Sequence, residues 1–396
     1  MKRLGSEKKE RNKNGKRRKV LILLVIIFAL LAAFITGYKL HVSSKKQDAK
    51  EKKTASESAD PEGESFDDLD LAEGDIGLIE TVTYPDSYTE EEASQQGSIQ
   101  EISYTVDALG NAAESGDAGT YEKSAIVYLP YGYSEENQYN IIYLAHGMGG
   151  TQYTFPGKPG EPESSDFKKL VDHMIEDDLM EPVIIVFPTI TPSVSSNDEE
   201  YEDKLMSVMQ NEYVSTLIPL MESTFSTYAE STDKAGLLAS RDHRCMSGFS
   251  MGGCLTWRML WHETGYFRYY LPFSMVADYH NVTNIADTSQ FMYQDMQAAG
   301  YSGEDFEIYC ASGTKDYTNL FVREQVNDLL EYSDLFTYTS TGWEDGNLMY
   351  AEWPGHYHRY YESYPYFFCG FLRTFPTEKT SSYMQDTDAA TRESEK

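Results

Sequence analysis

The sequence predicts an α/β fold, in which a mostly parallel central sheet carries helices on both faces. Short apolar segments typical of strands alternate with helical segments along the body of the chain, and no internal repeat divides it. Alternation of this kind favours a parallel sheet covered on both faces. The chain has 396 residues, of which 40% are hydrophobic, and it can therefore bury the core that such a fold needs.

Seven segments rich in β-branched and aromatic residues are expected to be strands. The first two form an antiparallel opening, and a helix that ends near Thr224 precedes the fifth. Candidate catalytic residues should lie at the carboxyl ends of the parallel strands, where the chemistry of open sheets gathers. In chain order the strands are expected at 98–106, 124–130, 140–146, 182–188, 243–249, 270–276 and 306–313.

The N-terminal residues are expected to anchor the chain in a cell membrane. Residues 1–19 form a basic tail with ten Lys or Arg against two Glu, and residues 20–38 are apolar and uncharged. As a helix, 20–38 would span about 28 Å, close to the ~30 Å hydrocarbon core. The basic excess before this transmembrane span predicts a cytoplasmic N-terminus and an extracellular body. A cleaved signal peptide is the alternative, although no clear cleavage site follows the span.

Composition divides the rest of the chain into three parts. Residues 39–75 are rich in Lys, Glu, Asp, Ser and Ala and nearly lack large apolar side chains, so a disordered stalk is expected. Residues 76–377 hold the apolar segments and form the predicted folded domain. Residues 378–396 resemble the stalk in composition and are expected to be a disordered tail.

Charge and cysteine usage exclude several classes of function. The net charge is −31, which repels phosphate backbones, so nucleic acid is not expected as a partner. Cys245, Cys254, Cys310 and Cys369 lie in apolar surroundings without metal-ligand spacing. They are interpreted as buried thiols, with one disulfide among them left open.

The segment 248–252 matches G-x-S-x-G, with Ser250 at its centre. It follows an apolar strand and precedes a helical stretch, which is the setting of a strained turn that exposes a nucleophilic serine. Glycine is needed at 248 and 252 because a side chain there would meet neighbouring backbone. A serine hydroxyl also needs a histidine base and a carboxylate that orients it. Both are expected later in the chain.

The carboxylate and the base are sought in two loops after Ser250. Asp316 follows the strand at 306–313 and is the expected carboxylate, and Asp278, after the preceding strand, is the competing acid. The loop before the last aromatic helix contains both His356 and His358. Chemistry alone does not choose between these two histidines.

Backbone amides should stabilise the oxyanion of an acyl-transfer reaction. The segment HGMGG, residues 146–150, directly follows a buried strand, and its glycines allow close backbone approach. We expect one donor from Met251, directly after the nucleophile, and a second from Met148 or Gly147.

Five stretches occur in the order found in a known family. They are EKSAIVYLPYGYSEENQYNIIYLAHGMGG, the helix ending in LIPLMESTFST, RCMSGFSMGG, ASGTKD and PGHYHRYY. Over roughly residues 98–375 the chain thereby resembles the esterase group of α/β-hydrolases that includes esterase D and the feruloyl and acetyl xylan esterases of carbohydrate esterase family 1.

The resemblance implies an α/β-hydrolase fold and a triad of Ser250, Asp316 and His356, with no metal and no organic cofactor. It is the reason for placing His356 ahead of His358. In the feruloyl esterase branch the catalytic histidine is commonly followed by Asp-Trp, with another Trp three residues further on. With His356 as the base, these positions hold Tyr357, His358 and Tyr361. This difference from the feruloyl esterase pattern bears on whether the enzyme accepts a phenolic acyl group.

The N-terminal span and the family resemblance together imply a membrane-anchored serine esterase that removes acetyl or feruloyl groups from plant cell-wall polysaccharide. The expected partner is therefore an acylated oligo- or polysaccharide. Two alternatives stay open: an acyltransferase that passes the acyl group to a sugar hydroxyl, and a non-catalytic surface module that binds glycans.

Overall fold

The computed structural model describes residues 78–79, 81–107, 120–190 and 199–384. All of them belong to one compact unit, residues 76–396. The predicted basic tail, transmembrane span and stalk, at 1–19, 20–38 and 39–75, lie outside the described residues. Within the described ranges, every helix is too short or too polar to cross a membrane.

An eight-stranded sheet in the order β1-β2-β4-β3-β5-β6-β7-β8 forms the centre of this unit. β1 pairs antiparallel with β2, and β2 with β4, while all other neighbours are parallel. The predicted mostly parallel sheet with an antiparallel opening is therefore confirmed. The strands are β1 (Ser98–Asp107), β2 (Thr120–Leu129), β3 (Asn140–Ala145), β4 (Val183–Pro188), β5 (Arg244–Phe249), β6 (Tyr269–Phe273), β7 (Glu307–Gly313) and β8 (Leu348–Trp353).

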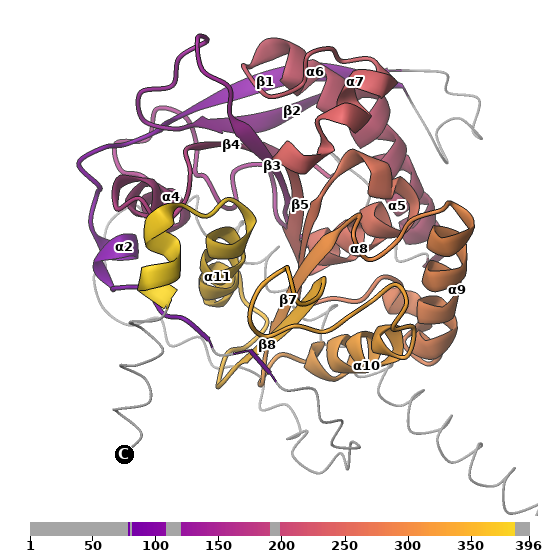
Figure 1. Ribbon diagram of the computed structural model, residues 1–396. Coiled ribbons are helices and arrows are strands. Elements are labelled where there is room, and N and C mark those ends of the chain that lie inside the picture. Colours follow the sequence, from indigo (N-terminus) through magenta and orange to yellow (C-terminus); the bar gives the residue numbers. More distant parts are fainter. Residues whose placement is uncertain (1–77, 80, 108–119, 191–198, 385–396) are drawn as a thin grey trace, which may run out of the picture. The chain divides into compact units, whose positions relative to one another are not determined.

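Helices cover both faces of the sheet (Figure 1). α4 and α11 lie on one face and α5, α8 and α9 on the other. β3, β4, β5, β7 and β8 are buried at every position, which explains their nearly continuous apolar sequences. The helices are α2 (Ser87–Glu90), α4 (Asp166–Glu176), α5 (Glu199–Glu212), α6 (Ile218–Thr224), α7 (Lys234–Ala239), α8 (Met251–Glu263), α9 (Ile285–Ala298), α10 (Asn319–Leu330) and α11 (Tyr364–Thr374).

Two expectations about the C-terminal part of the domain differ from the structure. β8 was not among the predicted strands, although it pairs along its whole length with β7. The predicted disordered tail at 378–396 is wrong for its first seven residues, because 378–384 form a helix. Thr380 is fully buried and donates to the Leu179 carbonyl at 2.8 Å, and Tyr383 packs edge-on against Phe368. These contacts offset the entropy of ordering a polar segment.

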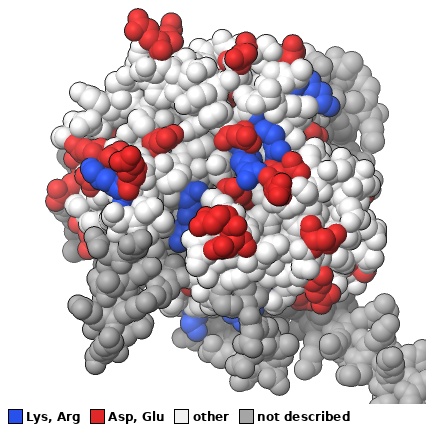
Figure 2. Space-filling model, in the orientation of Figure 1, with Lys and Arg blue, Asp and Glu red and all other residues white. Residues whose placement is uncertain are grey.

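Charged side chains are scattered over the face of the molecule seen in Figure 2, among other residues, and do not gather into one patch. Acidic groups are spread over this face, and basic groups lie among them. Dispersed acidic side chains of this kind are typical of a surface charge that favours solubility, and not of a binding site for one cationic partner.

Candidate active site

Ser250 lies in a sharp turn between β5 and α8, at the carboxyl edge of the sheet. Its φ of 58° and ψ of −122° are rare for a residue with a side chain. A backbone hydrogen bond ties the turn to the neighbouring strand β6, because the Ser250 amide donates to the Phe273 carbonyl at 2.9 Å. Strain of this kind persists only where the surrounding structure imposes it, and it is typical of catalytic residues.

Two glycines allow the backbone to pack closely enough to form this turn. A Cβ at Gly248 would lie 2.3 Å from the Gly252 carbonyl oxygen, and a Cβ at Gly252 would lie 2.2 Å from the Ala145 carbonyl oxygen. Both distances are below any real contact, so glycine is required at both positions. The predicted role of the G-x-S-x-G glycines is thereby explained by the packing of α8 onto β3 and β5.

The side chains of Ser250, His358 and Asp316 form one hydrogen-bonded chain. His358 Nε2 lies 2.8 Å from Ser250 Oγ, and His358 Nδ1 lies 2.9 Å from both carboxylate oxygens of Asp316. An ionised carboxylate can only accept, so Nδ1 carries the proton and Nε2 accepts from the serine hydroxyl. The three residues come from the turns after β5, β7 and β8, which meet at one edge of the sheet.

The Asp316 carboxylate is held in its ionised form within the protein. It is 4% exposed, and Oδ1 also accepts from the amide and the hydroxyl of Thr318 at 2.8 and 2.7 Å. Burial alone would raise the pKa of Asp316, but the His358 imidazole and the Thr318 hydrogen bonds bring this pKa below its usual value. Asp278, the competing acid, lies after β6 at the start of the 3₁₀ turn Tyr279–Asn281 and takes no part in this chain.

The position predicted for His356 is occupied by His358. The His356 backbone packs directly on Gly313, where a Cβ would lie 2.1 Å from the His356 carbonyl oxygen. Its imidazole lies near the ring of Trp353, and its Nδ1 is 2.8 Å from the Glu362 carbonyl. The prediction of His356 as the base is therefore corrected: His356 supports the loop, and His358 reaches the serine.

Two aromatic rings enclose the His358 imidazole. The ring of Phe249 lies 4.7 Å from the imidazole and that of Tyr317 lies 4.5 Å from it. With His358 as the base, the two residues after the histidine are Arg359 and Tyr360 in place of the Asp-Trp pair. An aromatic residue is therefore retained at the second position. The sequence did not identify His358 as the base, because His356 and His358 are only two residues apart and either can be aligned with the histidine of the family motif.

The segment 146–150, named here the oxyanion turn, lies against Ser250. A Cβ at Gly147 would lie 2.9 Å from the Ser250 Cβ. The Tyr360 side chain covers the turn, with its hydroxyl close to Gly147 and Gly150. The Gly147 backbone forms a hydrogen bond to this hydroxyl, and burial raises the pKa of the hydroxyl. Met251 is the first residue of α8, so its amide has no acceptor within the helix. The Gly147 backbone is engaged by Tyr360, which leaves Met251 and Met148 as the expected oxyanion donors.

Within the described residues, no cluster of three or more His, Cys, Asp or Glu side chains could hold a metal ion. Cys245, Cys254, Cys310 and Cys369 are buried free thiols. Burial raises the pKa of Cys245, Cys310 and Cys369, which disfavours the reactive thiolate form.

The sheet order, the turn at Ser250 and the helices on both faces define the α/β-hydrolase class. Solved structures agree with this class. A mutant of the feruloyl esterase module from Clostridium thermocellum, complexed with sinapinate, is 28% identical and superposes with a TM-score of 0.62 over 75% of this chain and 95% of that chain. The ferulic acid esterase of Anaeromyces mucronatus, at 16% identity and a TM-score of 0.52 over 74% of this chain and 97% of that chain, shares the fold.

Residues 121–376 match the family model described as "Putative esterase", and the chain belongs to this esterase family. Endo-1,4-beta-xylanase Y of Acetivibrio thermocellus is 33% identical over 293 residues, which cover 72% of this chain and 24% of that protein. The endo-1,4-beta-xylanase/feruloyl esterase of Xylanibacter ruminicola is 27% identical, over 43% of this chain and 20% of that protein. The chain thus spans about a quarter or less of these relatives' length.

The oxyanion turn begins with a buried neutral histidine, which makes the stability of the domain depend on pH. His146 is 5% exposed, its Nε2 accepts from the Ile190 amide at 3.1 Å, and burial lowers its pKa to about 4. Well above pH 6.5 the imidazole is neutral in both the folded and the unfolded state. As the pH falls toward 4, only the unfolded chain takes up the proton, so this residue destabilises the fold by up to about 3 kcal/mol.

We therefore expect the stability advantage of the wild type over a His146→Asn variant to shrink as the pH falls from 6.5 to 4. Urea unfolding of both proteins at several pH values measures this difference. A difference that stays constant across the range would show that His146 is not held neutral by burial.

Proposed function

We propose that this chain is a serine esterase that hydrolyses carboxylic esters through Ser250, with His358 as the base and Asp316 as the orienting carboxylate. One observation carries the proposal, namely the unbroken hydrogen-bonded chain from Ser250 Oγ through both imidazole nitrogens to Asp316. The spacing of 2.8 Å between serine and imidazole is within direct proton-transfer reach. Membership of the esterase family supports the same reaction.

The first half-reaction forms an acyl-enzyme. Ser250 Oγ attacks the ester carbonyl carbon while its proton moves to His358 Nε2, and Asp316 stabilises the imidazolium that results. The amides of Met251 and Met148 donate to the tetrahedral oxyanion. Collapse of the intermediate breaks the bond to the alcohol, which leaves with the proton from Nε2.

The second half-reaction repeats these steps with water as the nucleophile. His358 takes a proton from water as the hydroxide adds to the acyl carbon, and then returns it to Ser250 Oγ as the acid departs. The free carboxylic acid and the restored enzyme are the products.

For the substrate we propose acetyl or feruloyl esters of plant cell-wall xylan. Support comes from the relatives, whose names describe endo-1,4-beta-xylanases and feruloyl esterases. Retention of an aromatic residue, Tyr360, at the position of the first family tryptophan is compatible with this assignment. The xylanase activity in those names is not carried over, because the match covers only part of each relative.

The wild-type chain should release acetate from p-nitrophenyl acetate and acetylated xylan, or ferulate from methyl ferulate and feruloylated xylan. Ser250→Ala should lower kcat by at least about 10⁴-fold, because the nucleophile is lost. Turnover and product identity are measured together by chromatography. Unchanged turnover in the variant would refute Ser250 as the nucleophile, and a wild type inactive on all four esters would refute the substrate class.

His358 and His356 offer a matched pair, since only one of them reaches the serine. His358→Asn should lower kcat by at least about 10³-fold, whereas His356→Asn should cost less than about tenfold because it keeps a donor toward the Glu362 carbonyl. Steady-state kinetics of the two variants on one ester decide the matter. The reverse ranking would restore His356 as the base.

For its location we propose a single-pass anchor at residues 20–38, with the N-terminus in the cytoplasm and the esterase domain outside the cell. Support comes from the sequence alone: ten basic residues precede an apolar stretch of 19. Protease added to intact cells should cleave the domain from the membrane fraction. A domain protected until the cells are lysed would contradict this orientation.

A further inference from the structure

A buried ion pair lies behind the oxyanion turn. Lys123 on β2 donates to both carboxylate oxygens of Glu212, at 2.8 and 2.7 Å, and the two side chains are 2% and 3% exposed. The hydroxyl of Tyr104 donates to the same carboxylate at 2.9 Å. Replacing such a pair by apolar residues is often neutral or stabilising, so stability alone is a weak reason for its presence.

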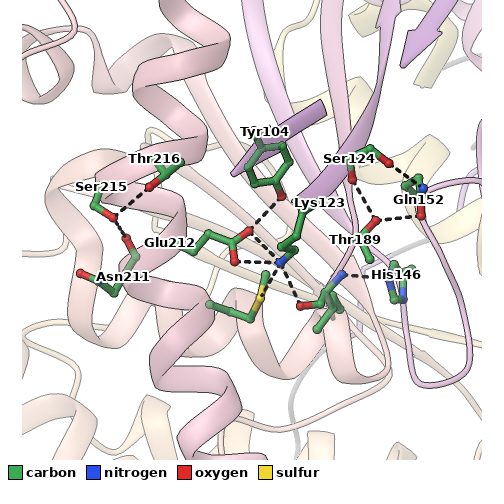
Figure 3. A network of polar contacts seen from close by, with 12 residues as sticks. Tyr104, Lys123, Ser124, His146, Gln152, Thr189, Asn211, Glu212, Ser215 and Thr216 are labelled. Atoms are coloured by element: carbon green, nitrogen blue, oxygen red, sulfur yellow. Dashed lines mark hydrogen bonds and ion pairs between the residues drawn. The ribbon is translucent and has the colours of Figure 1, made fainter. Parts of the chain in front are cut away.

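The ion pair is connected to the end of β4 through one residue, Ile190. Lys123 Nζ also donates to the Ile190 carbonyl at 3.1 Å. The amide of Ile190 donates to His146 Nε2 at 3.1 Å. Figure 3 shows Lys123 between the Glu212 carboxylate and this backbone segment, with His146 on the other side of it.

His146 continues the connection to the oxyanion turn. Because a backbone N–H can only donate, Nε2 is the acceptor and Nδ1 carries the proton. Nδ1 therefore donates to the carbonyl of Gly147, at 2.7 Å. Burial lowers the pKa of His146, which keeps this neutral tautomer at ordinary pH. The Gly150 amide donates to the same carbonyl at 3.1 Å.

The Gly147 carbonyl and the Met148 amide belong to one peptide unit. Since a trans peptide is planar, holding the C=O on one side fixes the direction of the N–H on the other. Hydrogen bonds to the carbonyl also polarise the unit and strengthen the N–H as a donor. The position of the Met148 amide is thus set by groups that do not touch the substrate.

We propose that Lys123, Glu212 and His146 are positioning residues that orient the Met148 amide toward the oxyanion. This inference rests on the proposed function, in which Met148 supplies one of the two donors. The order of contacts runs from Glu212 through Lys123, Ile190 and His146 to the peptide after Gly147.

The test replaces the buried polar groups without leaving an unpaired charge. In Tyr104→Phe/Lys123→Met/Glu212→Leu the fold should persist, but the Ile190 segment loses its anchor. We expect kcat on p-nitrophenyl acetate to fall about 10- to 100-fold with KM nearly unchanged, and the thermal unfolding midpoint to stay within a few degrees of the wild type.

A second buried Lys-carboxylate-Tyr group provides the matched control. Lys168 and Tyr128 both bond to Asp172, which also accepts from the Gly97 amide. In the part of the chain that the structure describes, this group is tied to β2 and α4 rather than to the oxyanion turn. Tyr128→Phe/Lys168→Met/Asp172→Leu should leave kcat near the wild-type value.

Variants of His146 test the same inference without disturbing the ion pair. An Asn side chain places an amide N–H near the position of Nδ1 but offers no acceptor to the Ile190 amide. His146→Asn should therefore lower kcat about as much as the Lys123 triple variant, because both variants break the connection at Ile190. His146→Gln reaches only the Nε2 position and should lose about 10- to 100-fold. Wild-type kcat in a folded Lys123 triple variant would overturn the proposal, and so would wild-type kcat in His146→Gln. If the triple variant does not fold, the His146 pair decides. A wild type without any esterase activity would instead overturn the proposed function.

Discussion

The close approach of α8 to β3 and β5 is the constraint on which the site depends. Without side chains at 248 and 252, the helix begins immediately after the strand, and Ser250 is forced into a conformation with positive φ at the sheet edge. This geometry brings the serine hydroxyl to the turns after β7 and β8, and brings the first amide of α8 beside it. Nucleophile, base and oxyanion donor are thus brought together by one packing contact between secondary-structure elements.

Each of the two buried histidines near the active site has a hydrogen-bond partner that can only accept or only donate, and this partner fixes the histidine tautomer. Asp316 can only accept, and so fixes the tautomer of His358. The Ile190 amide can only donate, and so fixes the tautomer of His146. The two imidazoles thus have defined hydrogen-bond partners: His358 contacts the Ser250 hydroxyl, and His146 contacts the carbonyl of the peptide before Met148.

Local patterns in the sequence were sufficient for part of this structure. The strand-turn-helix around Ser250 could be predicted because its glycines and apolar flanks are contiguous, and Asp316 because it directly follows a buried strand. The choice between His356 and His358 could not, since it depends on contacts between distant segments. Gly355, with a φ of 78°, turns the chain, and Gly313 receives the His356 backbone, so that the later histidine faces Ser250.

Long-range packing also explains the other differences. The helix at 378–384 is polar in sequence, and its order comes from contacts with Leu179 and Phe368, far away in the chain. Likewise, Lys123 and Glu212 carry no sequence motif, and their pairing across 89 positions becomes evident only when β2 and α5 are seen side by side.

A fluorophosphonate probe tests the central claim most directly, because it phosphonylates only an activated serine. Intact mass and peptide mapping of the labelled protein should show one adduct, on the peptide that contains Ser250, and labelling should be lost in a His358→Ala variant but kept in a His356→Ala variant. A wild-type chain that stays unlabelled, or an adduct on any other residue, would contradict the assignment of Ser250 and His358.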